Sequence, residues 1–391
     1  MSLVDVSAGQ PLILARKESP AAKWSTRFII PLLSLIFCAL LFHYLSDGAF
    51  LTSRNLSNLS RQVCVNLTLA VGMTMIILTS GIDLSVGSVL ALAGMLAAIT
   101  QVHFGWSQYG AFGAMLSAVS AIAVGGATGA FTGFAISKLR ITPFIVTLGM
   151  MVICRGLTLI VSGAQAVAPL GSSLGRLSSD YVSTSTSLIW ILVMGATWIG
   201  FQVKQYFLKP DIALLARQSA IAILSVGASA YVFCGYRGVP YMVFVAASCA
   251  LIGIFILKYT KYGRFLYAIG GNREAAELSG VPVTKTLWLT YFLMGCLAGL
   301  AGLMDVSRVN GAVPSAGELA ELDAIAAVVI GGTSLMGGMG TIAGTLFGVL
   351  IMGVLNNGMS LIGISEHYQK VFKGMVIILA VYLDLKSSKK K

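Results

Sequence analysis

Residues 63–100 read VCVNLTLAVGMTMIILTSGIDLSVGSVLALAGMLAAIT, two apolar runs joined by a polar break at 81–87. Each run has about the length at which an α-helix, rising about 1.5 Å per residue, crosses about 30 Å of hydrocarbon. A soluble core helix would be shorter and would carry a polar stripe. This stretch therefore predicts two membrane-spanning helices with an interruption between them.

The rest of the chain repeats this pattern. Of its 391 residues, 57% are hydrophobic and 10% are charged, against about 25% charged residues in a soluble domain. Spans are expected at 28–44, 63–79, 84–100, 111–136, 144–162, 188–203, 220–236, 241–257, 287–304, 319–335, 341–361 and 371–383. The predicted fold class is all-α, a polytopic integral membrane helix bundle of about ten core transmembrane helices plus an extra pair, about twelve in all. The spans that end at Thr100 and Leu335 are short or polar at one end, which leaves re-entrant or broken helices open there.

The charges predict the topology. An even number of crossings places both termini on one side, and most of the 26 Lys and Arg residues then fall on that side, which the positive-inside rule makes cytoplasmic. We therefore expect a cytoplasmic N-terminal arm at 1–27, a transmembrane domain at 28–385 and a basic cytoplasmic tail at 386–391. The formal net charge of +12 is interpreted as topology, because nothing resembles a nucleic-acid module.

Small residues repeat at four-residue spacing inside the spans, a pattern that lets membrane helices approach closely. The sequence leaves two neighbours open, another helix of the same subunit or a second subunit. A shift of 250 residues also superposes small and apolar residues of 81–96 on those of 331–346, which favours two related halves. The repeats are Gly125, Gly129 and Gly133, then Gly340, Gly344 and Gly348, with Gly295 and Gly299 as a shorter case.

Polar residues within the spans are candidates for the solute path. Asp83 and Ser85 fit either a helix cap or a wall of the path. The acids Glu318, Glu321 and Asp323 begin a span, where carboxylates complement the helix dipole. Arg155, a base within a span, is expected to pair with a carboxylate or to lie near the membrane edge. The proposed path residues, each of which fits equally a hydrogen bond to a neighbouring helix, are Asn66, Asp83, Ser85, Thr147, Thr333 and Asn356.

A polar insert at 263–280 is unusual in composition. Asn272 fits the cap of a short helix that contains Glu274, Ala275 and Ala276, and Gly280 would stop that helix. The insert is therefore expected to form a compact amphipathic knob between two spans. Either it receives force from a partner, or it is an ordinary solvated loop.

Three motifs resemble the membrane subunits of ribose/xylose/galactose-type ABC sugar importers. They are GIDLSVG from Gly81, YGR followed by AIGGNREAA from Tyr262, and GGTSLMGGMG from Gly331. The likeness covers nearly the whole chain and is strongest to the D-xylose type. Relative to shorter members the chain carries an extra stretch at 188–236, interpreted as two added spans.

The resemblance implies a permease homodimer in the bacterial inner membrane, a cytoplasmic ABC ATPase and a periplasmic sugar-binding protein. It also implies that the knob is the helix that couples to the ATPase. The coupling residues expected from it are Gly263, Arg264, Gly270, Gly271, Asn272, Glu274, Ala275, Ala276 and Gly280.

Enzymatic roles find no support in the residues. No GxxxxGK[ST] phosphate loop occurs, so ATP hydrolysis is assigned to another polypeptide. The six cysteines lie in apolar segments without CxxC spacing, and no metal site, cofactor or catalytic residue is predicted. The chief alternative is a gradient-driven transporter of a small neutral solute, for which Asp83 and Arg155 are the candidate relay groups. An intramembrane enzyme would need paired catalytic groups, and none is found.

Overall fold

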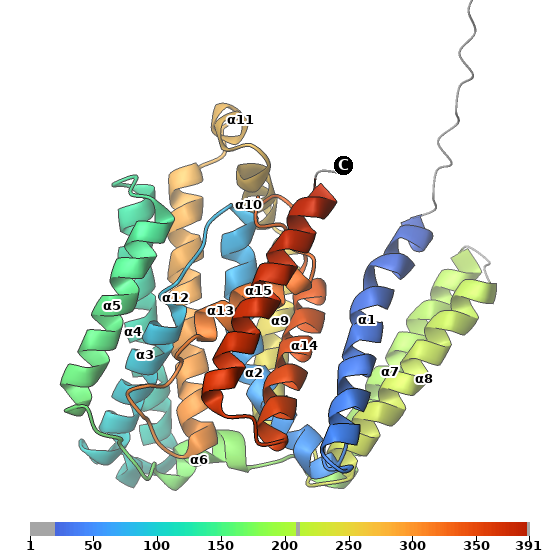
Figure 1. The fold of residues 1–391 in the computed structure, drawn as a ribbon, viewed down its shortest axis with the longest axis horizontal. Coiled ribbons are helices and arrows are strands. Elements are labelled where there is room, and N and C mark those ends of the chain that lie inside the picture. The colour runs from blue at the N-terminus through green and yellow to red at the C-terminus, as the bar shows by residue number, and fades with distance from the viewer. Residues whose placement is uncertain (1–19, 209–211, 389–391) are drawn as a thin grey trace, which may run out of the picture.

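The computed structural model describes residues 20–208 and 212–388, and within these ranges it is helical with no β-strand beyond two isolated bridges. The arm at 1–19 and the last three residues of the basic tail lie outside them. Figure 1 shows one bundle with α6 across one end and α11 protruding from the other. The helices are α1 (Pro20–Leu45), α2 (Ser53–Leu78), α3 (Val86–Val102), η1 (Trp106–Tyr109), α4 (Gly110–Ser137), α5 (Pro143–Ser162), α6 (Ser172–Ser179), α7 (Thr184–Leu208), α8 (Ile212–Cys234), α9 (Tyr241–Tyr259), α10 (Lys261–Gly271), α11 (Arg273–Leu278), α12 (Val283–Val309), α13 (Ala320–Ile330), α14 (Ile342–Leu361) and α15 (Glu366–Ser388).

Each of the twelve predicted spans coincides with a helix. Eight helices in the described part of the chain are long and apolar enough to cross a membrane, and α3 and the Pro31–Leu45 part of α1 are shorter apolar helices. The predicted interruption between the two runs of 63–100 is confirmed by the break before α3. Of the two spans for which a broken helix was left open, α3 is continuous over 17 residues, and α13 has only 11 residues and ends before Leu335. α6 and α10 are additional helices that hydropathy does not predict, because both are short and carry polar residues.

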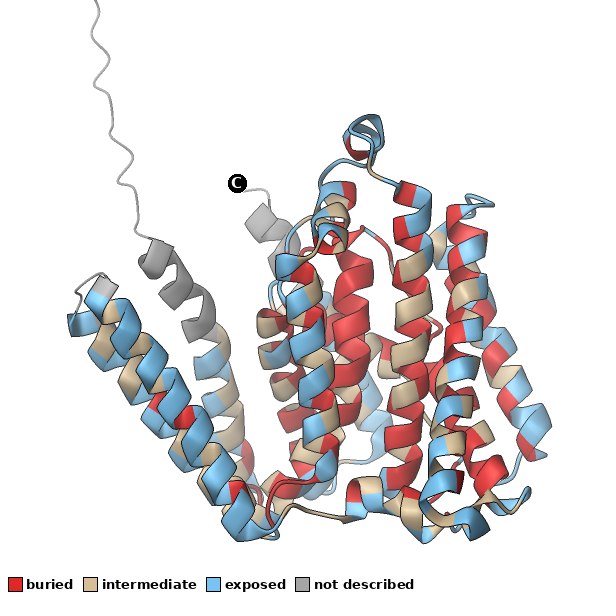
Figure 2. Ribbon diagram, turned by 180° about the vertical axis from the view of Figure 1, so that it is seen from behind, coloured by how far each residue is buried: buried red, intermediate tan, exposed pale blue. Residues whose placement is uncertain are grey.

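Burial separates the centre of the bundle from its lipid-facing rim. α2 is the central helix, because 83% of its most apolar window is buried inside the protein. The same fraction is 17% for α7 and 6% for α8, although both are apolar enough to span. α7 and α8 pair with each other and lie to one side with α1 (Figures 1 and 2). The predicted extra pair is thus an appendage, and its exposed apolar surface suits contact with lipid.

The glycine repeats pack helix against helix within the subunit. A Cβ added at Gly125 would overlap the carbonyl oxygen of Gly295, and one at Gly129 would overlap that of Tyr291. α4 and α12 therefore meet backbone to backbone, which only residues without side chains permit. Gly348 likewise lies against the Ala327 carbonyl, so that α14 packs on α13. Of the two neighbours left open by the sequence, a helix of the same subunit is the one these positions contact.

The two segments related by the 250-residue shift lie together at the centre. α2 leads through the break at 79–85 into α3, and α13 leads through the break at 331–341 into α14. The breaks are joined directly, because the Gly338 N–H donates to the Leu78 carbonyl at 3.0 Å and the Ser80 hydroxyl donates to the Met336 carbonyl at 2.7 Å. Equivalent interruptions of the two halves thus contact each other.

Candidate functional site: a polar cavity and a protruding helix

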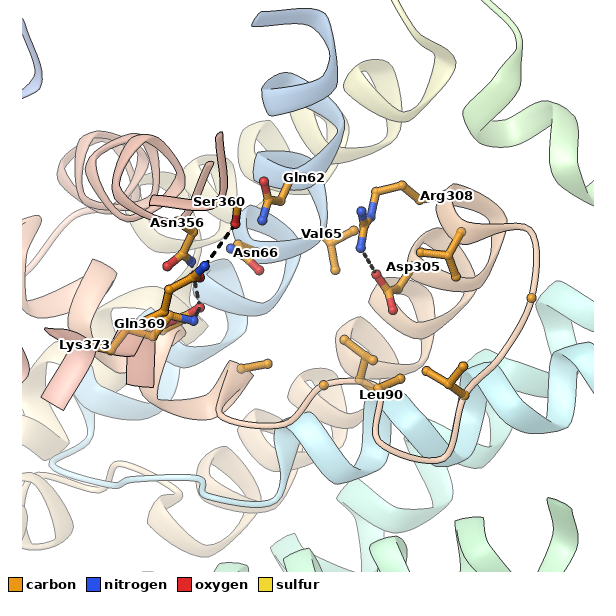
Figure 3. Close-up of a pocket in the computed structure, with 17 residues that line it drawn as sticks. Gln62, Val65, Asn66, Leu90, Asp305, Arg308, Asn356, Ser360, Gln369 and Lys373 are labelled. Carbon is orange, nitrogen blue, oxygen red and sulfur yellow. Dashed lines mark hydrogen bonds and ion pairs between the residues drawn. The ribbon is translucent and has the colours of Figure 1, made fainter. Parts of the chain in front are cut away.

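A cavity of about 340 Å³ opens between α2, α12, α13, α14 and α15. It lies toward the ends of these helices that are opposite α11, and Figure 3 shows polar side chains around it. Four amide side chains line it, together with two acids, two bases and a serine. These polar residues are Gln62, Asn66, Asp305, Arg308, Asp323, Asn356, Ser360, Gln369 and Lys373.

The charges of the cavity are paired with one another. On α12, Arg308 Nη2 lies 2.8 Å from Asp305 Oδ1. Lys373 on α15 reaches Asp323 on α13, with Nζ 2.9 Å from Oδ2. Because two carboxylates face two cations, the lining carries no net charge and suits a neutral solute better than an ion.

Two acceptor oxygens buried beside the cavity have no hydrogen-bond partner among the described residues. Asn356 Nδ2 donates to Asp323 Oδ2 at 3.0 Å, so this carboxylate oxygen accepts from both Asn356 and Lys373. Asp323 Oδ1 and Asn356 Oδ1 are buried and accept no hydrogen bond from the described chain. Buried acceptors of this kind normally have a donor, so the site is suited to a molecule rich in hydroxyl groups.

Gln369 positions the wall formed by α15. Its amide nitrogen donates to the Ile364 carbonyl at 2.8 Å and to the Ser360 hydroxyl at 3.3 Å. Nearby, Lys370 Nζ lies 2.7 Å from Glu318 Oε1. Because that ammonium donates to the carboxylate, it holds the pKa of Glu318 below its ordinary value. The start of α15 is thus held to the bundle largely through polar contacts.

The predicted path residues fall in different places. Asn66 and Asn356 line the large cavity. Asp83 and Ser85 instead lie in the break before α3, where Asp83 Oδ1 accepts from the Ser85 N–H at 2.8 Å and from its hydroxyl at 2.6 Å. This pairing is a local turn just before α3, and the Ser85 side chain makes no capping hydrogen bond to that helix. A role of either residue in the solute path stays a prediction. Thr147 is buried on α5.

Neither Thr333 nor Arg155 lines the large cavity. Thr333 is fully buried in the break at 331–341, away from the large cavity. Among the described residues, Arg155 forms no ion pair with a carboxylate. Its Nη1 donates to the carbonyls of Pro314 and Ala316, at 2.6 and 2.8 Å. It thereby fixes the segment that leads into α13, whose Ala316 lines the cavity. Of the two alternatives expected for Arg155, the carboxylate partner was wrong, because bare carbonyls in an irregular segment need donors as much as a carboxylate does. A position near the membrane edge stays a prediction.

The predicted knob is a pair of short helices. Thr260 caps α10 by accepting from the Gly263 N–H, and Asn272 caps α11 by accepting from the Ala275 N–H at 2.9 Å. Of α11, Ala276 alone is buried; the other residues from Arg273 to Leu278 are exposed. Leu278 is 90% exposed, an unusual position for a leucine at the tip of a protruding helix (Figure 1). The predicted short helix that contains Glu274, Ala275 and Ala276 is confirmed as α11, with Asn272 as its cap.

The base of the knob is attached to both breaks. A Cβ at Gly270 would overlap the Leu78 carbonyl oxygen and the Gly338 backbone nitrogen. The Tyr267 hydroxyl donates to the Gly340 carbonyl at 2.9 Å. A displacement of α10 would therefore be passed directly to the end of α2 and to the segment between α13 and α14. Among the remaining expected coupling residues, Gly263 is buried against α9, and Arg264, Gly271, Glu274 and Gly280 are exposed.

Comparison with known proteins places the chain in a family of transport proteins. The xylose transport system permease protein of Escherichia coli K12 is 38% identical over 359 residues, 90% of each chain. That of Haemophilus influenzae is 36% identical over 369 residues, 92% of this chain and 96% of the relative. The ribose import permease protein of Escherichia coli K12 is 39% identical over 338 residues, 86% of this chain and 87% of the relative. No solved structure matches the chain.

The match to a family extends through the bundle. Residues 55–381 match the family described as branched-chain amino acid transport system / permease component, a range that includes both breaks, the cavity and the knob. With its helices long and apolar enough to span a membrane, this chain is a multi-pass membrane protein and belongs to that family of transport permeases.

Proposed function

We propose that the chain is the transmembrane subunit of an ATP-binding cassette importer that translocates a neutral monosaccharide, D-xylose or a related pentose or hexose. The observation that carries this proposal is its 36–39% identity, over most of its length, to xylose and ribose permeases. The cavity supports the same class of solute, since amides and internally paired ions hydrogen-bond to hydroxyl groups without requiring a charged ligand.

An amino acid is less well accommodated, although the family takes its description from amino acid transport. A branched-chain amino acid carries a carboxylate, an ammonium group and an apolar side chain. The two cations and two anions of the cavity already neutralise one another at 2.8 and 2.9 Å. Separating them to receive a zwitterion would leave charges unpaired, and that costs free energy.

We assign the knob formed by α10 and α11 to the ATPase contact. Its exposed apolar tip at Leu278 and its attachment to both breaks suit a helix that inserts in a groove of another protein. The basic residues Lys261, Arg264, Arg273 and Lys285 cluster at this end, which makes it the cytoplasmic side under the positive-inside rule. The start of α1 and the end of α15 lie at the end of the bundle that carries α11 (Figure 1). Both termini are therefore assigned to the cytoplasm.

The remaining assignments follow from this architecture. Import requires a periplasmic sugar-binding protein at the opposite end, a second copy of the permease beside the first and a bacterial inner membrane around both. The chain itself has no catalytic role, and a separate subunit hydrolyses ATP.

The decisive experiment reconstitutes the permease in proteoliposomes with its ATPase and sugar-binding protein and measures D-xylose and D-ribose uptake. Uptake is expected to require ATP inside and to survive an uncoupler. A catalytically disabled ATPase provides the matched control and should abolish uptake. If uptake instead collapsed with the uncoupler and persisted without ATPase activity, the gradient-driven alternative would replace this proposal.

A further inference from the structure

We propose that Asp323 and Asn356 form a sugar-contact site inside the permease itself. Asp323 Oδ1 and Asn356 Oδ1, which are buried beside the cavity in this conformation, would accept hydrogen bonds from two hydroxyl groups of the passing monosaccharide when α13 and α14 move apart. This proposal rests on the function proposed above. It goes further by assigning part of the discrimination between sugars to the membrane subunit rather than to the delivering protein alone.

The site is built by three helices rather than by one surface residue. Asp323 lies in the first turn of α13, Asn356 on α14 and Lys373 on α15. Asp323 is 7% exposed and Asn356 is 5% exposed, yet both line the cavity. Figure 3 shows Asn356 and Lys373 on the same side of the cavity, across from the Arg308–Asp305 pair.

The hydrogen bonds inside the site determine what ligand it accepts. Asp323 Oδ2 already accepts hydrogen bonds from Asn356 Nδ2 at 3.0 Å and from Lys373 Nζ at 2.9 Å. These bonds orient both groups and offset the negative charge, and they leave one oxygen of each without a donor. Because Lys373 offsets the charge of Asp323, the two oxygens are suited to accept hydrogen bonds from an uncharged donor such as a sugar hydroxyl. An anion would be repelled by these oxygens, and a further cation would compete with Lys373.

The site is also suited to releasing the sugar. Each residue offers a single acceptor. The bond to the Asp323 carboxylate is the stronger of the two, and the net gain from each is limited because the hydroxyl gives up hydrogen bonds to water. The two residues lie on α13 and α14, the helices that the break at 331–341 joins, and that break contacts the knob through Tyr267 and Gly270. A movement of the knob would therefore change the separation of α13 from α14 and with it the spacing of the two acceptors.

The test compares Asn356→Leu with Asn357→Leu in proteoliposomes that hold the ATPase and one fixed sugar-binding protein. Asn357 is the matched control, because it is the adjacent amide on α14 and bonds reciprocally with Asn55, at 2.9 and 3.2 Å, outside the cavity lining. The substrates are D-xylose, D-ribose and their analogues that each lack one hydroxyl. The preference of the binding protein is common to all samples, so it cancels when variants are compared.

In the wild-type protein, we expect at least one deoxy analogue to be transported about 3- to 10-fold less efficiently than its parent sugar. Asn356→Leu should lose part of that discrimination, while Asn357→Leu should retain it. Equal discrimination by Asn356→Leu and wild type would overturn the contact site while leaving the transport function intact. Absence of sugar uptake by the wild-type assembly would instead overturn the proposed function. Asn356→Ala, which also removes the acceptor, gives the same test if the leucine variant fails to assemble.

Discussion

Gly270 offers the sharpest test of how motion passes from the knob to the membrane. Replacing it with alanine puts a Cβ where the Leu78 carbonyl oxygen and the Gly338 nitrogen already lie. Real Cβ contacts essentially never fall below 3.0 Å, and both obstacles are backbone atoms that no rotamer change can move. α10 must therefore shift by roughly 1 Å from the breaks, an overpacking that costs about 1–3 kcal/mol.

The adjacent glycine supplies the control. A Cβ at Gly271 meets nothing within 4 Å, and alanine favours the helix by about 0.5–1 kcal/mol. Gly270→Ala should therefore unfold at a lower temperature in nanodiscs than wild type, whereas Gly271→Ala should not. In the reconstituted assembly, Gly270→Ala should transport less sugar per ATP hydrolysed while ATPase binding persists. Any loss of uptake in Gly271→Ala would arise at the partner contact instead, as expected if this exposed position faces the ATPase.

The measurement is thermal unfolding of the isolated permease, followed by paired assays of sugar uptake and ATP hydrolysis. A Gly270→Ala variant that matched wild type in both stability and uptake per ATP would contradict the close contact of α10 with the breaks. Equal losses of stability in Gly270→Ala and Gly271→Ala would contradict it too, because the structure provides an obstacle at the first position alone.

Three further predictions follow from packing, capping and charge. Gly129→Leu would force α4 from α12 and should prevent folding, with a loss above about 4 kcal/mol, whereas Gly149→Leu, where nothing lies within 4 Å, should assemble normally by size-exclusion chromatography. Asp83→Ala would leave the buried N–H that begins α3 without its acceptor and should cost about 1–3 kcal/mol; Asp83→Asn retains an acceptor and should lose less by thermal unfolding. Because Lys370 lowers the pKa of Glu318, their pair stabilises the protein above the ordinary carboxyl pKa, and this contribution is lost as pH falls through the lowered value. Glu318→Gln should therefore reduce the slope of melting temperature against pH in the acidic range, and an unchanged slope would contradict this pairing.

Hydropathy predicted the membrane helices because lipid imposes the same demand on every span. An apolar run of sufficient length has no alternative to a helix in hydrocarbon, where each backbone group must be paired internally. α10 is different, since Lys261, Arg264 and three glycines give it a mixed composition. The buried residues of α10 are spaced as on one face of a helix: Gly263, Leu266 and Ile269. This periodicity indicates a helix, but mean hydropathy over a span-length window does not detect it.

The polar cavity was only partly visible in the sequence. Asn66 and Asn356 are conspicuous as amides within apolar runs, and both line it. Asp323 was attributed to the helix dipole, and it does lie in the first turn of α13. Its pairing with Lys373, 50 residues away, depends on how α15 folds back over α13. No local pattern specifies that return, so the ion pair and the two free acceptors emerge only from tertiary structure.

The knob and the cavity are mechanically coupled because the same helices contact the knob and line the cavity. α2 ends against α10 at Leu78 and contributes Val65 and Asn66 to the cavity. α13 and α14 meet the knob through the break that joins them and contribute Asp323 and Asn356 to the cavity wall. Close-packed helices transmit a shift with little internal deformation. A cytoplasmic partner that draws α11 outward would therefore move both sides of the cavity without ever contacting the sugar, and a neutral, weakly bonded solute is the cargo that such a movement can release.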